Sequence, residues 1–466
     1  MDGDVPHVEW VAGSHVPAPA TVSYPVRDGN LVQPLIDAVP TFTRIADAVD
    51  AAKASVWVVA AFLWPAFRLP GGRGTVFDLL DRAAARGLDV RMLVWRPEPG
   101  MYGLGKVFVG TEADRELLRS RGSRFAIRWD RAHPGFAQHQ KSWLIDAGEP
   151  TETAFVGGIN LTASIPHVPG HPGGGQVHDV YVEIAGPAAS DVHHNFVQRW
   201  NEASERLAED GVWPNADAAS DLPFPRVLSP ARGTSRVQIQ RTVHPGRYTD
   251  ATPAPGASGY DIAQGERSIL DQYLAAIDAA RTSIHIENQA IPIPLVAERL
   301  ERALRRGVAV VAIVPGVAEE GVRTARRHAA HRESFDRLAA LGRHERFVLA
   351  GLAGRGASDG RSEVHVHAKV MVVDDAWATI GSCNLHRHSL LGNTEMNASI
   401  WDPVIARSLR CALMAEHLDI DTGGMDALGV FEVFQRVARD NRQLREAGSS
   451  DWQGIVHSLD PGTYGR

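Results

Sequence analysis

Apolar and polar residues follow the same order in two distant parts of the chain. Residues 43–62 (TRIADAVDAAKASVWVVAAF) begin with apolar residues at helical spacing and end in an apolar run rich in valine and alanine. Residues 271–290 (DQYLAAIDAARTSIHIENQA) repeat that order. Helical apolar spacing indicates a helix packed on a core, and a short β-rich apolar run indicates a buried strand. Each segment therefore predicts a helix followed by a strand.

The segments that follow these two also match each other. Residues 76–95 and 296–315 each predict an amphipathic helix, a glycine at the helix end and a buried strand. Helices that alternate with apolar strands pack on sheets, and the repeated order predicts an α/β protein of two similar halves. Residues 209–235, rich in Pro, Ala, Ser and Asp, are the expected linker. We therefore place the halves at residues 1–220 and 221–466.

Composition narrows the context in which the protein acts. The 466-residue chain has a formal net charge of −7, which does not require a nucleic-acid partner. Its first residues are acidic where a secretion signal is basic, and no apolar run is long enough to cross a bilayer. We expect a cytoplasmic protein, or a secreted one if a signal was removed. The two cysteines, Cys383 and Cys411, are expected to be core thiols.

A short motif occurs once in each half. His139, Lys141 and Asp146 recur as His367, Lys369 and Asp374, each pair being 228 residues apart (367 − 139, 369 − 141 and 374 − 146). A strand and a turn of small residues follow each copy, and these turns contain Gly158 with Asn160, and Ser382 with Asn384. A single H-x-K-x4-D match has little weight, but two copies at equivalent places predict a functional site.

The spacing of the motif indicates its chemistry. Residues i and i+2 of a strand point to the same side, so each His–Lys pair faces one surface, whereas Asp146 and Asp374 are expected to be structural. If the halves pack about a pseudo-twofold axis, two imidazoles, two ammonium groups and two Asn amides meet in one site. Lys and Asn would bind a phosphodiester anion, while one histidine attacks phosphorus and the other protonates the leaving alcohol. This chemistry requires no metal and no other cofactor.

A histidine nucleophile needs a hydrogen-bond acceptor, usually a carboxylate, on its far nitrogen. Asp179 and Glu395 each stand at the head of an alternating strand downstream of the asparagine of their own half. We therefore pair Asp179 with His139 and Glu395 with His367. A surface salt bridge is the alternative role for each carboxylate.

Other residues near the motifs have two interpretations each. Glu287 and Gln289 alternate on a predicted strand, where they either line the site, with Gln289 binding substrate, or form buried structural hydrogen bonds. Residues 167–175 (HVPGHPGGG) suit a loop at the rim of the site better than a metal site. Three aromatic residues are candidates for an apolar lip that receives acyl chains, with core packing as the better prediction for the last: Trp64, Phe67 and Trp95.

With these motifs the sequence resembles the phospholipase D superfamily, whose members carry two HKD motifs in one chain. The likeness spans about residues 43–420, and residues 178–201, 237–242 and 284–289 resemble the phosphatidylcholine-type branch. The resemblance implies two pseudo-symmetric halves, each a central mixed β-sheet flanked by helices, with the active site at their interface. It also implies a covalent phosphohistidine and hydrolysis or head-group exchange of phospholipids. By likeness to bacterial members, His139 is the nucleophile and His367 the general acid.

The sequence also departs from that branch. His388 stands where the family usually has an arginine, and we expect no C2, PX or PH module in a chain of this length. Another phosphodiesterase or a nuclease of the superfamily, a cardiolipin synthase-like phosphatidyl transferase and a noncatalytic lipid-binding protein stay open as alternatives. The expected partners are a phospholipid or other phosphodiester and an acceptor water or alcohol. We expect transient contact with a membrane surface and no nucleic acid.

Overall fold

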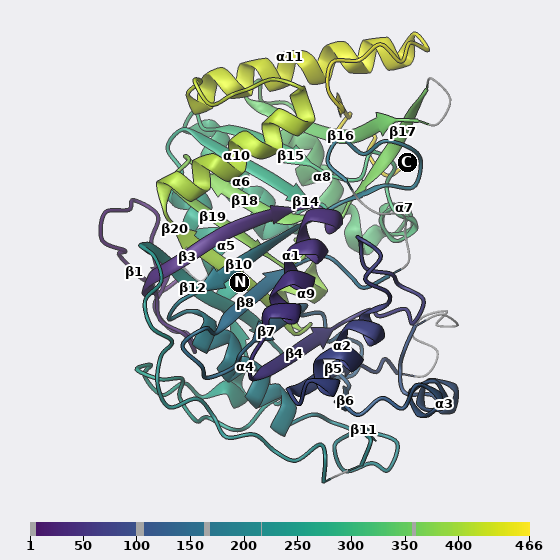
Figure 1. Ribbon diagram of the computed structural model, residues 1–466. Helices are drawn as coiled ribbons and strands as arrows, with labels where there is room; N and C mark the ends of the chain where they lie inside the picture. Colours follow the sequence, from purple (N-terminus) through teal and green to yellow (C-terminus); the bar gives the residue numbers. More distant parts are fainter. Residues whose placement is uncertain (1–5, 99–106, 163–167, 216, 357–359) are drawn as a thin grey trace.

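The computed structural model describes residues 6–98, 107–162, 168–215, 217–356 and 360–466 (Figure 1). A large mixed β-sheet flanked by helices forms its interior, which confirms the α/β fold predicted from the sequence. The helices are α1 (Ala38–Ala51), α2 (Val76–Ala85), α3 (Glu112–Arg121), α4 (Ala189–Asn201), α5 (Ser268–Ala279), α6 (Pro294–Arg305), α7 (Glu320–Arg327), α8 (Arg332–Leu341), α9 (Arg387–Leu391), α10 (Pro403–Leu418) and α11 (Ala427–Glu446), with 3-10 turns at Ile262–Gln264 and Ala329–His331.

The strands of the two halves are arranged in the same spatial order. The first half has β3 (Arg27–Ile36), β10 (Val180–Ala185), β8 (Thr153–Gly157), β7 (Ser142–Ile145), β4 (Ser55–Ala60), β5 (Asp89–Trp95), β6 (Ala126–Asp130) and β11 (Val212–Trp213). The second half has β12 (Ser235–Val243), β20 (Glu395–Trp401), β19 (Trp377–Gly381), β18 (Lys369–Val373), β14 (Ser283–Asn288), β15 (Ala309–Ile313) and β16 (Phe347–Arg355). In each half the pairings are antiparallel from the first strand as far as β4 or β14, and the next two are parallel. This shared order is the structural form of the sequence repeat.

Several strand pairings join the two halves. β3 pairs antiparallel with β12, and the short β9 (Val177–His178) runs parallel to β17 (Arg361–Val366). β1 (Val8–Glu9) pairs with β2 (Ala18–Pro19), and the segment that contains them packs on the core of the second half. The remaining strands, β13 (Glu266–Arg267) and β21 (Val456–Ser458), pair within the second half. The division at residue 220 stays a prediction.

Buried apolar residues lie between the halves and on the outer face of each sheet. One cluster combines inner-face residues of both sheets, such as Val182 and Ile380, with residues of α4 and α10. Helices α1 and α2 cover the outer face of the first sheet, and α5 and α6 cover that of the second. Strands buried on both faces need apolar side chains on both, which explains the continuous SVWVVA run of β4.

Asp146 and Asp374 each hold the loop between a helix and a strand. Asp146 Oδ1 accepts hydrogen bonds from the backbone N–H groups of Lys53 and Ala54, each at 2.8 Å. The Asp374 carboxylate accepts equivalent bonds from Arg281 and Thr282, also at 2.8 Å. These contacts secure the approach to β4 and to β14. The aspartate of each motif therefore has a structural contact, in which it holds the backbone of a loop.

The structure corrects one expectation about the aromatic residues. Trp95 is buried in the core, as predicted, but Phe67 is also buried and packs edge-to-face on Phe42 with ring centroids 5.2 Å apart. The apolar-lip prediction is therefore wrong for Phe67, because its ring fills the core under α1. Of the predicted core thiols, Cys383 is buried and Cys411 half-buried. Among the described residues, no helix is both long and apolar enough to span a membrane.

Candidate active site

Backbone hydrogen bonds between the halves bring each motif beside a strand of the other half. The N–H of His139 donates to the carbonyl of Thr394 (2.9 Å), the residue before the second-half candidate carboxylate. The N–H of His367 donates to the carbonyl of His178 (2.8 Å), the residue before the first-half candidate carboxylate. The same contact thus occurs twice, as a pseudo-twofold relation between the halves requires.

The two carboxylates pair with the histidines across this interface, so our same-half assignment is wrong. A Glu395 oxygen lies 2.8 Å from His139 Nδ1, and an Asp179 oxygen lies 2.6 Å from His367 Nδ1. Both carboxylates are at most 1% exposed. Each one stands at the head of a strand of its own half, but the backbone contact of the preceding residue directs it toward the motif of the other half. Each histidine–carboxylate pair is therefore formed only when the halves associate.

Gly158 and Ser382 occupy equivalent turns and contact these carboxylates. A Cβ atom at Gly158 would collide with the Asp179 carboxylate, so this position must lack a side chain. The Ser382 hydroxyl donates to Glu395 over 2.6 Å. Both residues therefore help to place a carboxylate. Their binding to substrate, expected from the sequence, stays a prediction.

Both motif lysines are buried, and each side chain reaches back to the histidine of its own motif. Lys141 Nζ donates to the carbonyl of His139 over 2.7 Å, and Lys369 Nζ donates to the carbonyl of His367. Lys369 also donates to the side-chain oxygen of Gln289 over 3.2 Å. Gln289 therefore reaches the site, which favours the first of the two interpretations given above for this residue.

The side-chain oxygens of Asn160 and Asn384 have no hydrogen-bond partner within the part of the chain that the structure describes. Both oxygen atoms are buried. Unpaired buried polar atoms are costly, and an amide oxygen needs a donor, which an incoming water or alcohol has and a phosphate anion lacks. Glu287, by contrast, is bound by three histidines away from the motif lysines: His178, His285 and His417. Its role is therefore in a separate cluster.

Burial is the main cause of the lowered pKa values of the four motif bases. Burial lowers the pKa of His139 below its ordinary value and that of His367 well below it. Burial also lowers the pKa of Lys141 to about 7, with Lys369 adding repulsion, and that of Lys369 to about 8. The free site thus favours neutral imidazoles and binds its lysine protons weakly, and an anionic substrate would strengthen that binding.

The two carboxylates differ in the number of donors around them. Glu395 accepts from the Ser382 hydroxyl (2.6 Å) and the Asn393 amide (3.3 Å) as well as from its histidine. Burial opposes the charge of Glu395, but attraction to His139 and its hydrogen bonds outweigh burial, so its pKa lies below the ordinary value. For Asp179, burial is dominant and raises the pKa to about 7. Glu395 is therefore the more firmly ionised of the two.

The chain matches two family models and several characterised relatives. Residues 174–292 match the model of the family Phospholipase D, and residues 273–415 match that of Cardiolipin synthase, PLD-like domain. Phospholipase D alpha 2 of Oryza sativa subsp. japonica is 25% identical over an alignment of 484 positions, gaps included, that covers 75% of this chain. The chain belongs to the phospholipase D superfamily. Both family models overlap the second-half strand β14, and together they reach from before Asp179 to α10.

The chain is shorter than the superfamily relatives that it matches. It spans 59% of the rice protein and 21% of Phospholipase D1 of Schizosaccharomyces pombe, which is 29% identical over 53% of this chain. The crystal structure of phosphatidylserine synthase from Haemophilus influenzae Rd KW20 superposes with a TM-score of 0.53. That alignment covers 88% of this chain and 93% of the synthase at 13% identity. This last likeness supports the superfamily fold alone.

Three residues of the site are absent from our sequence analysis. The Phe62 ring lies edge-on to the His139 ring, with centroids 6.4 Å apart. His386 faces His139 and Glu395, and burial lowers its pKa to about 4. Glu319 accepts a hydrogen bond from Gln289 over 2.8 Å. Phe62 follows β4 and His386 follows the second small-residue turn, so proximity to a motif element is the signal that could have identified these two.

We predict that kcat/KM for bis-p-nitrophenyl phosphate falls as the pH rises above about 7. If Lys141 offsets the charge of a bound phosphate, as the sequence predicts, it must carry a proton, and its pKa of about 7 means that the free protein loses this charge there. Because the pKa of His139 lies below 6.5, its imidazole is still neutral at pH 6.5. The loss of activity on the acid side of the profile is therefore expected below that pH. Lys141→Arg keeps its charge and should move the alkaline limb toward the pKa of Lys369, about 8. Initial rates measured across this range check the profile, and an unchanged limb in the arginine variant contradicts the assignment.

Proposed function

We propose that the protein is a phospholipase D-type phosphodiesterase that removes a phospholipid head group and transfers the phosphatidyl group to water or an alcohol. The observation that carries this proposal is the crossed pair of histidine–carboxylate contacts, at 2.8 and 2.6 Å. Both motif lysines are buried next to these pairs. Two imidazoles from opposite halves, each with a lysine two residues further along the chain, suit a two-step displacement at phosphorus.

In the first step His139 attacks phosphorus. Ionised Glu395 accepts the Nδ1–H of His139, which leaves the lone pair of Nε2 free for attack. Substrate binding brings a negative charge into the site, which favours a proton on His367. The N–P bond forms, the bond from phosphorus to the head-group oxygen breaks, and protonated His367 gives that oxygen its proton. Lys141 and Lys369 stabilise the charge on the nonbridging oxygens.

In the second step water or an alcohol releases the phosphatidyl group. His367, now neutral, takes a proton from the incoming hydroxyl, whose oxygen attacks phosphorus. The N–P bond breaks, which returns neutral His139 and protonated His367. Water yields phosphatidic acid, and an alcohol yields a phospholipid with a new head group. Neither step routes electrons or protons through a metal.

A substrate panel tests this function. Purified protein is incubated separately with phosphatidylcholine, phosphatidylglycerol, bis-p-nitrophenyl phosphate and single-stranded DNA, and products are identified by mass spectrometry. We expect phosphatidic acid from a lipid, phosphatidylethanol when ethanol is added, and p-nitrophenol from the soluble diester. The variant with both His139→Ala and His367→Ala is the control for contaminating activity.

The panel also separates the alternatives. Cleavage of DNA with both lipids intact would assign the protein to the nucleases of the superfamily. Turnover of the soluble diester alone would leave the phosphodiester chemistry standing and contradict the lipid substrate. Transfer of a phosphatidyl group only between two phosphatidylglycerol molecules would favour a cardiolipin synthase-like reaction.

A further inference from the structure

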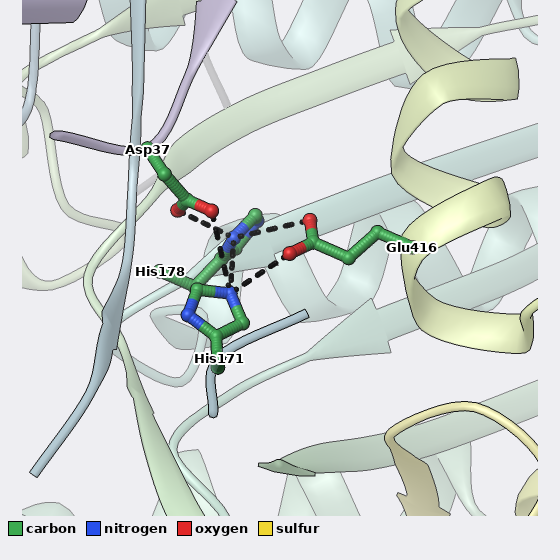
Figure 2. A group of neighbouring side chains, drawn as sticks. All are labelled: Asp37, His171, His178 and Glu416. Atoms are coloured by element: carbon green, nitrogen blue, oxygen red, sulfur yellow. Dashed lines mark hydrogen bonds and ion pairs between the residues drawn. The ribbon is translucent and has the colours of Figure 1, made fainter. Parts of the chain in front are cut away.

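Four polar side chains meet in the interior at atoms that the proposed reaction does not use (Figure 2). They are Asp37 between β3 and α1, His171 in the loop before β9, His178 in β9 and Glu416 in α10. One donor atom from each lies within 4.8 Å of the donor atoms of the other three. Three of the residues come from the first half and Glu416 comes from the second. The cluster therefore bridges the interface.

We expected residues 167–175 to form a rim loop and not a metal site, and most of the described residues of this segment are exposed. Residue 167 lies outside the described residues, but His171 is fully buried. The φ angles of Asp37 (+66°) and His171 (+45°) fall in a region that L side chains rarely adopt. The fold therefore holds both residues in uncommon backbone conformations while their side chains point into the cluster.

The cluster and the neighbouring Glu287 bring three buried carboxylates together, and their ion-pair partners among the described residues are all histidines. Asp37 and Glu287 are completely buried, and the Glu416 side chain is only 6% exposed. The histidines of these ion pairs are His171, His178, His285 and His417. Asp37 Oδ2 and Glu416 Oε2 are buried without a hydrogen-bond partner there. Such a group requires a further cation, either protons on the imidazoles or a metal ion.

The separations of the donor atoms match the size of a metal site. His171 Nε2 lies 3.3 Å from His178 Nδ1 and 3.0 Å from a Glu416 oxygen. His178 Nδ1 lies 3.1 Å from Asp37 Oδ1 and 3.7 Å from Glu416 Oε2. His171 Nε2 lies 3.5 Å from Asp37 Oδ2. A tetrahedral ion with bonds of about 2.0–2.1 Å sets its ligands about 3.3 Å apart. The observed separations lie on both sides of that value.

His178 also has the supporting contact that metal-bound histidines usually have. Its Nε2 lies 2.8 Å from Glu287, which can accept the proton of that nitrogen and so leave Nδ1 available to a bound ion. His285 and His417 hold the other oxygen of Glu287, each at 2.8 Å. Thr394 is the second-half residue equivalent to His178, and its carbonyl holds the backbone of His139 just as the His178 carbonyl holds that of His367. A threonine is sufficient for this contact. The backbone contact therefore does not explain why a histidine, with its buried polar partners, stands at position 178.

We propose that Asp37, His171, His178 and Glu416 bind one zinc-type divalent ion. Two imidazole nitrogens with two carboxylates select zinc or a neighbouring first-row metal over calcium and magnesium, which prefer all-oxygen sites. The ion ties α10 to the first half and fixes β9, whose His178 carbonyl holds the backbone of His367. Because the four ligands meet only in the folded chain, ion binding adds to the folding stability of the interface.

The metal content of the whole protein tests the proposal. Protein from zinc-supplemented culture is dialysed and analysed for first-row metals by mass spectrometry, and about one ion per chain is expected. His171→Ala and Glu416→Gln should each lower the bound metal and the zinc affinity by at least about tenfold. Wild-type protein stripped with chelator should unfold at a lower temperature and recover its original Tm when zinc chloride is added.

A matched control separates ligand loss from general damage. His193 is buried and bonded to Glu152 (2.8 Å) outside the cluster, so His193→Ala should retain its metal. Circular dichroism checks that each variant folds, and Glu416→Gln preserves side-chain shape. The proposal is overturned if wild-type protein holds no first-row metal and the stripped chain takes up no zinc, which would indicate protonated histidines instead. Equal zinc binding by wild type and both ligand variants, which indicates adventitious surface sites, also overturns it.

Discussion

His139→Ala is expected to form no phosphoenzyme, whereas His367→Ala should accumulate one from bis-p-nitrophenyl phosphate. p-Nitrophenol leaves readily without a proton donor, so loss of the general acid spares the first step for this substrate. Release of the intermediate is then slow, because His367 is also the base for the incoming water. Turnover should fall about 10²- to 10⁴-fold in His367→Ala and at least about 10⁴-fold in His139→Ala. One p-nitrophenolate leaves and the other stays on phosphorus, so mass spectrometry of acid-free quenched digests should detect a p-nitrophenylphosphoryl group on the peptide that contains His139.

The control for this experiment is again a buried histidine outside the site. His193→Ala removes an imidazole bonded to Glu152 and should leave both steps intact. A p-nitrophenylphosphoryl group on the His367 peptide of the His139→Ala variant would reverse the two roles but keep the two-step mechanism. Absence of a phosphoenzyme in both variants, with residual turnover in either, would show that the reaction is not covalent.

Glu395→Gln should resemble loss of the nucleophile, and Asp179→Asn should resemble loss of the general acid. The side-chain amide that replaces the Glu395 carboxylate can donate to Nδ1 of His139, which moves the ring proton to Nε2 and blocks attack on phosphorus. A wrong tautomer of this kind costs about 10⁴-fold in rate. Asp179→Asn perturbs His367 instead, so a phosphoenzyme should still form from the nitrophenyl substrate and then persist. Single-turnover formation and decay of the phosphoenzyme separate the two outcomes.

These two variants also test the crossed pairing itself. The carboxylate of Glu183, on the same strand β10 that follows Asp179, pairs with Arg44 and not with the site. Glu183→Gln is therefore the matched control and should leave both rates unchanged. If Glu395→Gln accumulates the intermediate and Asp179→Asn prevents it, the carboxylates act within their own halves, contrary to the contacts described above.

The sequence by itself determined the elements of each half and the positions of the two His–Lys motifs. The helix and strand expected in residues 43–62 are α1 and β4, and those in residues 271–290 are α5 and β14. Apolar spacing is a local property that burial on one face imposes on any helix or strand, so it can be read without the fold. The 228-residue repeat of His139 and Lys141 likewise shows in the sequence, because both halves require the same side chains at the same strand start.

Only the tertiary structure decided which side chains meet. Glu395 binds a histidine 256 residues away, although the sequence places it close behind the motif of its own half. The cluster of Asp37, His171, His178 and Glu416 was likewise hidden, because its members come from four separate elements and share no spacing. The physical reason is the same in both cases. Hydrogen bonds across the interface between two packed sheets set these contacts, and the distance between residues along the chain does not limit them.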